Sequence, residues 1–190
     1  MAARAETPIY QVPWYRGRVA SWITTVDHKR IGILYLVTCL VFFGAGGILA
    51  LLMRTQLAQP DESFLTRDSY NEVMTIHGVT MVFLVVVPIL AGFGNFLVPL
   101  MIGARDVAFP RLNALSYWLF LFGGLILFSS FFAAGGAAKT GWTIYPPLSE
   151  RSEDVGIDLL ILSLHILSVS SLVGAINFVV TIHRLRLRLS

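Results

Sequence analysis

The chain has 190 residues, of which 56% are hydrophobic and only 13% are charged. So few charged side chains do not cover the surface of a water-soluble protein of this length. The composition therefore excludes a soluble globular domain and predicts a membrane protein. In that setting the net charge of +3 reflects the placement of basic residues around a membrane, and nucleic acid is not an expected partner.

The first thirty residues are polar, aromatic and basic. They contain no short apolar core followed by a small-residue cleavage site, so the sequence predicts no cleaved signal peptide. The rings of Trp14, Tyr15 and Trp22 suit the headgroup level of a bilayer. We expect residues 1–30 to form an interfacial segment on the inner side of the membrane.

Four runs without Asp, Glu, Lys or Arg follow, and each exceeds the ~20 residues that cross a bilayer as a helix. They cover residues 31–53, 73–104, 112–138 and 159–183. The sequence therefore predicts an all-α membrane protein, a four-helix transmembrane unit over residues 31–183. Ten of the fourteen Lys and Arg residues lie in segments 1–30, 105–111 and 184–190. This bias places both termini, including a basic tail at 184–190, on the cytoplasmic side.

The second run is longer than a bilayer requires, and it contains Pro88 and the sequence AGFGN at residues 91–95. Proline removes one helical hydrogen bond, so we expect a kink or an irregular turn there. Backbone groups freed in this way find no partner in lipid. The middle of this helix is therefore predicted to face the bundle interior.

Near the start of the same run, TIHGVTMVF places His77 among apolar residues. Such a histidine either ligates a metal or bonds to a neighbouring hydroxyl or carbonyl group, and the residues alone leave both open. Gly78 would leave room for a flat group, so haem iron bound through a neutral imidazole accounts for the pair. Arg54, which ends the first run, either snorkels to the interface or reaches a polar substituent of such a cofactor.

Three further histidines need an interpretation. His165 lies at about the depth of His77 in the fourth run, so the two would clamp one haem in a stand-alone bis-histidine membrane cytochrome. The alternative for His165 is a core histidine bonded within the bundle. His28 and His183 stand beside basic residues at the inner surface, where an interfacial role is expected. The lone Cys39 excludes an intrachain disulfide.

The connection IGARDVAFPRLN, residues 102–113, carries Asp106 between Arg105 and Arg111. This carboxylate forms either a surface ion pair of little energy or the mouth of a polar path. Uncharged polar residues on the inner halves of the helices favour the path: Asn95, Asn113, Ser116 and Asn177. Because ordered water satisfies several buried amides at once, the pattern predicts a water file that takes up protons at Asp106.

Long ordered stretches carry these residues, among them WITTVDHKRIGILYL, NEVMTIHGVTMVF, GFGNFLVPLMIGARDVAFPRLNALSYW, GWTIYPPLS and LSLHILSVSSLVGAINFVVTI. In them the chain resembles the N-terminal third of subunit I of haem-copper oxygen reductases, the cytochrome c oxidase type with a D-type proton channel. The resemblance implies that the four helices form part of the twelve-helix bundle of that subunit.

The resemblance also implies a role for each candidate residue. His77 would be one axial ligand of a low-spin haem, and Arg54 would contact its formyl group if it is haem A, which is favoured over haem B or O. Asp106 would open the proton channel. Three asparagines would line its water file: Asn95, Asn113 and Asn177. The histidine that matches His165 is not an iron ligand in the family.

Our first hypothesis is a split or partial subunit I of a terminal respiratory oxidase, not catalytic alone, that serves oxygen reduction coupled to proton pumping. The second axial ligand, the high-spin haem and the copper are expected on a second polypeptide with the remaining helices. Other oxidase subunits, cytochrome c or quinol as electron donor, and lipid are the expected partners, in a bacterial inner membrane. The alternative is a non-catalytic four-helix paralogue that acts as a scaffold or assembly subunit.

Two departures from the family pattern concern local structure. The segment from Pro88 to Asn95 is one residue shorter than the common form P-x-x-x-G-G-F-G-N, so we expect a changed local shape of the channel. Gln56 stands where some members have a metal-binding glutamate. An outer calcium or sodium site is therefore not predicted.

Overall fold

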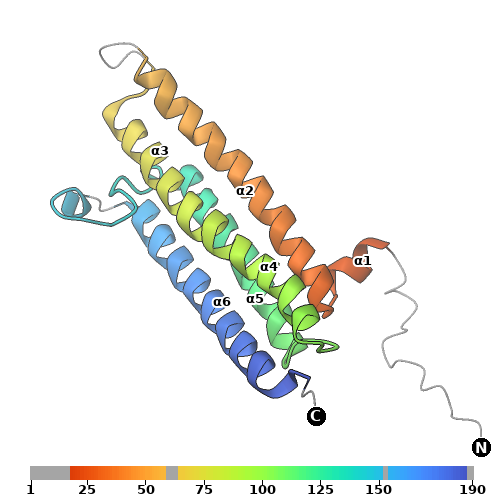
Figure 1. Cartoon of the computed structure of the whole chain (residues 1–190). Coiled ribbons are helices and arrows are strands. Elements are labelled where there is room, and N and C mark those ends of the chain that lie inside the picture. The colour runs from red at the N-terminus through yellow and green to blue at the C-terminus, as the bar shows by residue number, and fades with distance from the viewer. Residues whose placement is uncertain (1–17, 59–63, 152–153, 188–190) are drawn as a thin grey trace, which may run out of the picture.

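The computed structural model describes residues 18–58, 64–151 and 154–187. Its long helices run side by side in one bundle, with the short helix α1 (Arg18–Ile23) set aside at one end (Figure 1). The long elements are α2 (His28–Gln56), α3 (Arg67–Val79) continued by α4 (Val87–Met101), α5 (Pro110–Ser129) and α6 (Val155–Leu185). The predicted interfacial residues Trp14 and Tyr15 lie outside the described residues, and so do residues 188–190 of the predicted tail.

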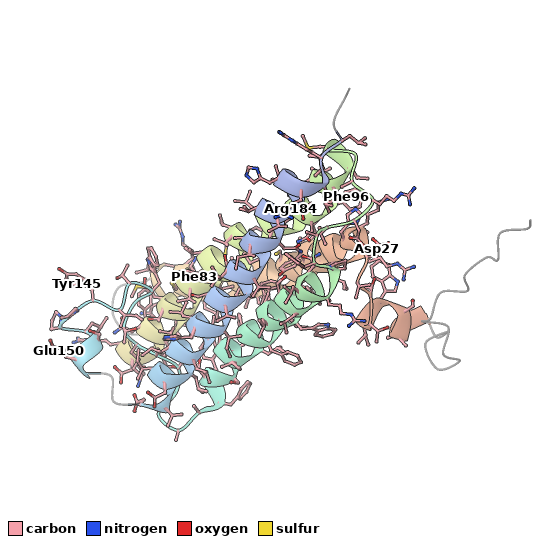
Figure 2. All side chains as sticks on the ribbon, turned by 90° about the horizontal axis from the view of Figure 1, so that it is seen from below. Asp27, Phe83, Phe96, Tyr145, Glu150 and Arg184 are labelled. Atoms are coloured by element: carbon pink, nitrogen blue, oxygen red, sulfur yellow. The ribbon has the colours of Figure 1, made fainter. Side chains whose placement is uncertain are left out.

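The described residues contain four helices long and apolar enough to cross a membrane, which confirms the predicted all-α membrane fold. They span His28–Gln56, Arg67–Met101, Pro110–Phe132 and Val155–Leu185. Figure 2 shows Asp27 and Arg184 at one end of the bundle and Tyr145 and Glu150 at the other. We call these two ends the His28 end and the Arg54 end, after the residues of α2 that lie there.

Polar caps set two of the helix starts. The Asp27 side chain accepts a hydrogen bond from the backbone N–H of Lys29 at 2.8 Å, and Thr66 accepts from Ser69 N–H at 3.2 Å. Each cap satisfies an N–H group that has no partner within its helix. The helices α2 and α3 therefore begin several residues before the charge-free runs.

The third span is shorter than predicted. A turn of 3-10 helix at Ser130–Phe132 ends it, whereas the charge-free run reaches residue 138. Gly135 and Gly136 follow with φ of 88° and 84°, a left-handed conformation that glycine adopts without a Cβ clash. The expected helix over 133–138 is therefore wrong, and these residues belong to the connection to α6.

The predicted irregular turn lies just before Pro88. Residues Thr80–Val86 form a π-helical segment, and the N–H of Val87 bonds to the carbonyl of Val82, five residues earlier. Since the proline ring crowds the preceding turn and offers no N–H, a wider turn at this point relieves the helix. The glycines of AGFGN remain in the regular helix α4. Only one face of the region is interior, because Leu84 is fully buried while Val86 is 56% exposed.

Small residues bring the helices close together. A Cβ added at Gly32 of α2 would lie 2.9 Å from the carbonyl oxygen of Gly92 in α4, so only glycine allows this approach. On the other side, the hydroxyl of Ser163 in α6 donates to the carbonyl of Gly123 in α5 at 2.8 Å. Two aromatic rings fill the space between α2 and α5, since Tyr35 and Phe120 stack with centroids 5.1 Å apart.

Candidate functional site

His77 joins α3 to α2 through one hydrogen bond. Its Nδ1 lies 2.9 Å from the backbone oxygen of Gly46. A carbonyl oxygen only accepts, so Nδ1 carries the proton and donates, and the lone pair of the neutral ring resides on Nε2. The hydrogen bond of the His77 ring found among the described residues is the one at Nδ1, so Nε2 is available to a ligand. A histidine fixed in this tautomer by a backbone carbonyl has the arrangement of a metal ligand.

The space over Gly78 is taken by protein. A Cβ added at Gly78 would lie 3.0 Å from both Cβ and Cδ1 of Trp142, a residue of the connection between α5 and α6. The expectation that Gly78 leaves room for a flat group is therefore wrong. The glycine instead lets Trp142 pack against the turn that contains His77. A cofactor at His77 would have to approach the Nε2 side of the ring.

Arg54 lies in the last turn of α2 and is exposed. It stands eight residues after Gly46, which corresponds to about 12 Å along the helix. The structure thus places Arg54 and His77 toward the same end of the bundle, but no contact joins them. Two residues after Arg54, the amide oxygen of Gln56 accepts hydrogen bonds from the N–H groups of Phe64 and Leu65. This oxygen therefore holds the connection between α2 and α3.

His165 is exposed on the surface of α6. Its Nδ1 donates to the carbonyl of Ile161 in the same helix at 2.8 Å. The histidine is thus not a core residue bonded within the bundle. Its position gives no support to a haem clamped between His165 and His77, because the His77 ring is bonded to α2.

Asp106 lies in the connection between α4 and α5, where one carboxylate oxygen receives two hydrogen bonds. The Oδ1 atom accepts from the N–H of Val107 at 2.8 Å and from Nδ1 of His28 at 3.0 Å. His28 is only 3% exposed, so the expected interfacial role is wrong for it. Within the described part of the chain, Asp106 pairs with His28 and with neither neighbouring arginine.

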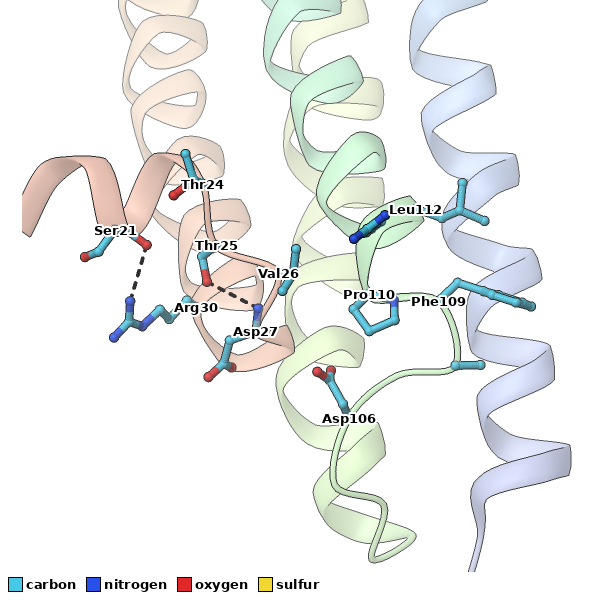
Figure 3. Close-up of a pocket in the computed structure, with 12 residues that line it drawn as sticks. Ser21, Thr24, Thr25, Val26, Asp27, Arg30, Asp106, Phe109, Pro110 and Leu112 are labelled. Carbon is cyan, nitrogen blue, oxygen red and sulfur yellow. Dashed lines mark hydrogen bonds between the residues drawn. The ribbon is translucent and has the colours of Figure 1, made fainter. Parts of the chain in front are cut away.

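A cavity of about 840 Å³ opens at Asp106. Figure 3 shows the carboxylate facing the segment before α2, which includes Val26 and Asp27, with Pro110 and Phe109 on the other side. The cavity therefore connects the Asp106 carboxylate, whose side chain is 38% exposed, with the surroundings at the His28 end.

Two of the three predicted asparagines carry buried polar atoms that have no partner among the described residues. Asn113 is 1% exposed, and neither its Oδ1 nor its Nδ2 is bonded. Asn95 is 2% exposed; its Nδ2 donates to the carbonyl of Ala91 at 2.9 Å, and its Oδ1 is unbonded. Buried amide groups need partners, and water fits a site with several of them. These two side chains therefore suit a hydrated path.

Asn95 also lines a second cavity, of about 860 Å³, among α2, α4, α5 and α6. Hydroxyl groups give it a polar wall. The Tyr35 hydroxyl donates to Oγ of Ser116 at 3.1 Å, and Ser116 donates to the carbonyl of Asn113 at 2.8 Å. Ser170 donates to the carbonyl of Ser116 at 2.6 Å. Polar groups thus continue from the Asn113 region into the bundle.

Asn177 behaves differently. Its Oδ1 accepts from the N–H of Phe109 at 2.9 Å, and its Nδ2 donates to the carbonyl of the same residue at 3.3 Å. Thr181, one turn later, accepts from the N–H of Ala108 at 2.9 Å. Asn177 therefore holds the backbone just before α5, and both of its amide atoms already have a backbone partner, unlike those of Asn113.

Sequence reasoning did not single out Tyr35 and Ser170, although both have a signal in the chain. Tyr35 is a buried phenol in an apolar run, and such a hydroxyl requires a partner. Ser170 precedes Asn177 by seven residues, which places the two on one face of α6.

The described residues contain no group of three or more His, Cys, Asp or Glu side chains that could hold a metal ion. A metal bound at His77 would therefore need ligands from elsewhere.

Comparison with known proteins gives consistent matches. Residues 30–189 match the family described as cytochrome c and quinol oxidase polypeptide I. The chain is 52% identical over 170 residues to the haem-copper oxidase subunit I+III of Aeropyrum pernix, covering 88% of this chain and 21% of that protein. It is 53% identical to cytochrome c oxidase subunit 1 of Synechocystis sp., covering 86% of this chain and 29% of the relative.

The cytochrome c oxidase subunit 1 of Bacillus subtilis is likewise 53% identical, over 165 residues that make up 87% of this chain and 26% of the relative. The chain therefore spans less than a third of the length of the curated relatives that it matches.

Proposed function

Because the chain belongs to the cytochrome c and quinol oxidase polypeptide I family, we propose that its four helices form part of the core of a respiratory haem-copper oxidase. In this proposal His77 is one axial ligand of a low-spin haem, and Asp106 is the entrance of a proton-uptake path. The chain then serves oxygen reduction together with other oxidase subunits.

The hydrogen bond from His77 Nδ1 to Gly46 O, 2.9 Å long, carries the proposed ligand role. It directs the lone pair to Nε2 and fixes the orientation of the ring. A bound haem supplies one-electron transfer. Arg54, at the same end of the bundle, is the proposed contact of the haem substituent, and a formyl group on haem A is the substituent favoured over those of haem B or O.

The second axial ligand, the high-spin haem and the copper belong in this proposal to subunit I helices other than the four described. One histidine cannot provide six-coordinate iron with both axial ligands, and the described residues hold no cluster suited to copper. Cytochrome c or a quinol is the proposed electron donor.

The proposed proton path begins at Asp106 in the cavity of about 840 Å³. Its carboxylate can exchange a proton with that cavity, while His28 holds it in place. The unbonded amide atoms of Asn113 and Asn95 then offer donors and acceptors to water along the way inward. The Ser116 hydroxyl continues the path toward the second cavity, and Asn177 supports it by holding the adjacent backbone.

The excess of Lys and Arg near the His28 end makes it the proposed cytoplasmic side, and a bacterial inner membrane is the proposed location. Protons would then enter from the cytoplasm.

The ligand role is tested with His77→Leu in the assembled oxidase complex. We expect the low-spin haem band of the reduced-minus-oxidised spectrum to be lost, because the iron loses an axial ligand. The matched control is His165→Leu, an exposed histidine of the same bundle, which should keep the band. A wild-type low-spin spectrum in the His77→Leu complex would refute the ligand role.

A further inference from the structure

Lys139 is surrounded by three carboxylates at the Arg54 end. Its Nζ lies 3.5 Å from Oδ2 of Asp154, 3.6 Å from Oε1 of Glu72 and 3.7 Å from Oδ2 of Asp68. Asp68 and Glu72 belong to the first turns of α3, and Asp154 precedes α6. One ammonium group thus connects the starts of two helices to the connection that follows α5.

This network favours the charged form of the amine. Partial desolvation lowers the pKa of Lys139, but the charges of Asp154, Asp68 and Glu72 together outweigh it, so the pKa lies above its ordinary value. Lys139 and Glu72 are mostly buried, with side chains 21% and 18% exposed. Their interaction is therefore screened by solvent less than that of an exposed surface pair.

The residues that follow Lys139 in the chain also contact helix α3. The N–H of Gly141 donates to Oγ1 of Thr75 at 2.8 Å, and that hydroxyl donates to the carbonyl of Asn71 at 2.6 Å. Trp142 then packs on Gly78, where an added Cβ would meet it at 3.0 Å. The contacted positions 72, 75 and 78 are spaced by three residues, so they lie along one face of α3.

We propose that Lys139 is a positioning residue for the turn that carries His77. By drawing three carboxylates together, it holds segment 139–142 against α3, and this keeps Trp142 packed on Gly78. The position and solvent exposure of the His77 turn then depend on the charge of Lys139, which pairs with Glu72 about one and a half turns before His77 in α3. This inference rests on the proposed role of His77 as a haem ligand.

Removal of the ammonium has a definite physical consequence. Without Lys139, the carboxylates of Asp68, Glu72 and Asp154 lose the ammonium group that they share, and the repulsion among them pushes the start of α3 away from the connection. The Gly141 to Thr75 hydrogen bond is the next contact to open. Trp142 then leaves Gly78, and water reaches the ligand turn.

The test compares Lys139→Met with Lys139→Arg in the assembled oxidase complex. Hydrogen exchange of the peptides containing Gly141 and Thr75 reports the contact without reference to haem. The absorption band and midpoint potential of the low-spin haem report the ligand turn. Lys29→Met is the matched control, because it removes the same charge from an exposed position at the His28 end.

We expect Lys139→Met to speed exchange of the Gly141 amide about fivefold and to shift both the haem band and the potential. Lys139→Arg should restore both, since guanidinium also pairs with carboxylates. Lys29→Met should change neither. If Lys139→Met does not assemble, the same exchange measurement on the wild-type complex in rising salt should show faster opening at Gly141, because salt screens the network.

Two results would overturn the positioning role. Wild-type exchange at Gly141 in the Lys139→Met complex, or no effect of salt where that variant does not assemble, would show that Lys139 does not hold the segment. Faster exchange with an unchanged haem band and potential would show a purely structural ion pair. A failure of the proposed function gives a different result. The low-spin haem band would then be retained in His77→Leu, whatever the exchange rate of Gly141 in Lys139→Met.

Discussion

His77 and Asp106 are both hydrogen-bonded to helix α2, His77 to the backbone of Gly46 and Asp106 to the side chain of His28. Positions 28 and 46 are separated by about 27 Å along a helix that rises 1.5 Å per residue. A single rigid element therefore sets the spacing between the proposed site of electron transfer and the proposed site of proton uptake. Movement of either site along the axis of α2 would break its hydrogen bond to that helix or require α2 itself to bend.

Asp106→Asn should slow proton uptake from the His28 end roughly tenfold or more, because an amide does not exchange a proton as a carboxylate does. Proton uptake by the reconstituted complex, followed with a pH-sensitive dye, measures this. Asp27→Asn is the matched control, since Asp27 lines the same cavity and asparagine still caps α2. Equal rates in the two variants would contradict the role of Asp106.

Asn177→Ala should lower the stability of the protein, whereas Asn113→Ala should alter proton uptake. Asn177→Ala removes two hydrogen bonds to the Phe109 backbone and should lower the free energy of unfolding by about 1–3 kcal/mol. Asn113→Ala removes no protein partner of its amide, so it should leave stability nearly unchanged and alter proton uptake instead. Thermal unfolding in detergent, with uptake kinetics, separates the two. The interpretation fails if Asn113→Ala is the more destabilising change.

Gly124→Ala should destabilise the bundle by about 1–3 kcal/mol, because the added methyl group would overlap the ring of Phe42 from α2. Gly47→Ala is the control. No atom lies within 4 Å of a Cβ added there, and alanine is the better helix former, so stability should be unchanged or higher. Midpoints of thermal unfolding in one detergent measure both effects, and equal loss in the two variants would argue against helix packing at Gly124.

The contribution of Lys139 to stability should vanish at alkaline pH. Its pKa is raised in the folded protein above the ordinary value of 10.5, so folding is favoured while the amine is protonated. The stabilisation is fully present below pH 10.5 and is lost as pH rises through the folded-state pKa. Unfolding midpoints of wild type and Lys139→Met, compared from neutral pH upward, should converge only above pH 10.5. A difference unaffected by alkali would contradict the charge argument.

The number of helices was readable from the sequence because lipid permits few charges in a span and requires backbone groups to bond internally. The end of the third span was not, since Gly135 and Gly136 terminate a helix only through their left-handed conformation, while their composition is as apolar as the span. The irregular turn at Pro88 was predicted, but its placement before the proline depends on the hydrogen bond from Val87 to Val82.

The candidate site, like the fold, was predictable from the sequence only in part. His77 and Asp106 were identified because ionisable groups are costly near a membrane interior. Their partners were not predictable, because Gly46 contributes only a backbone carbonyl and His28 lies 78 positions from Asp106 in sequence. The asparagines share a residue type and a depth, so sequence alone gave them one role. Packing separates Asn177, whose side-chain amide bonds the Phe109 backbone, from Asn113, whose side-chain amide has no partner among the described residues.

The π-helical segment Thr80–Val86 also determines how α3 is rotated about the helix axis relative to α4. Each residue added to or deleted from this segment would rotate α3 relative to α4 by about 100°, the angle per residue of an α-helix. His77 would then no longer point at Gly46 when Asn95 faces its cavity. The wide turn thus fixes the orientation of His77 relative to Asn95. A length change of one residue in it would disturb this orientation more than most substitutions in α3 or α4.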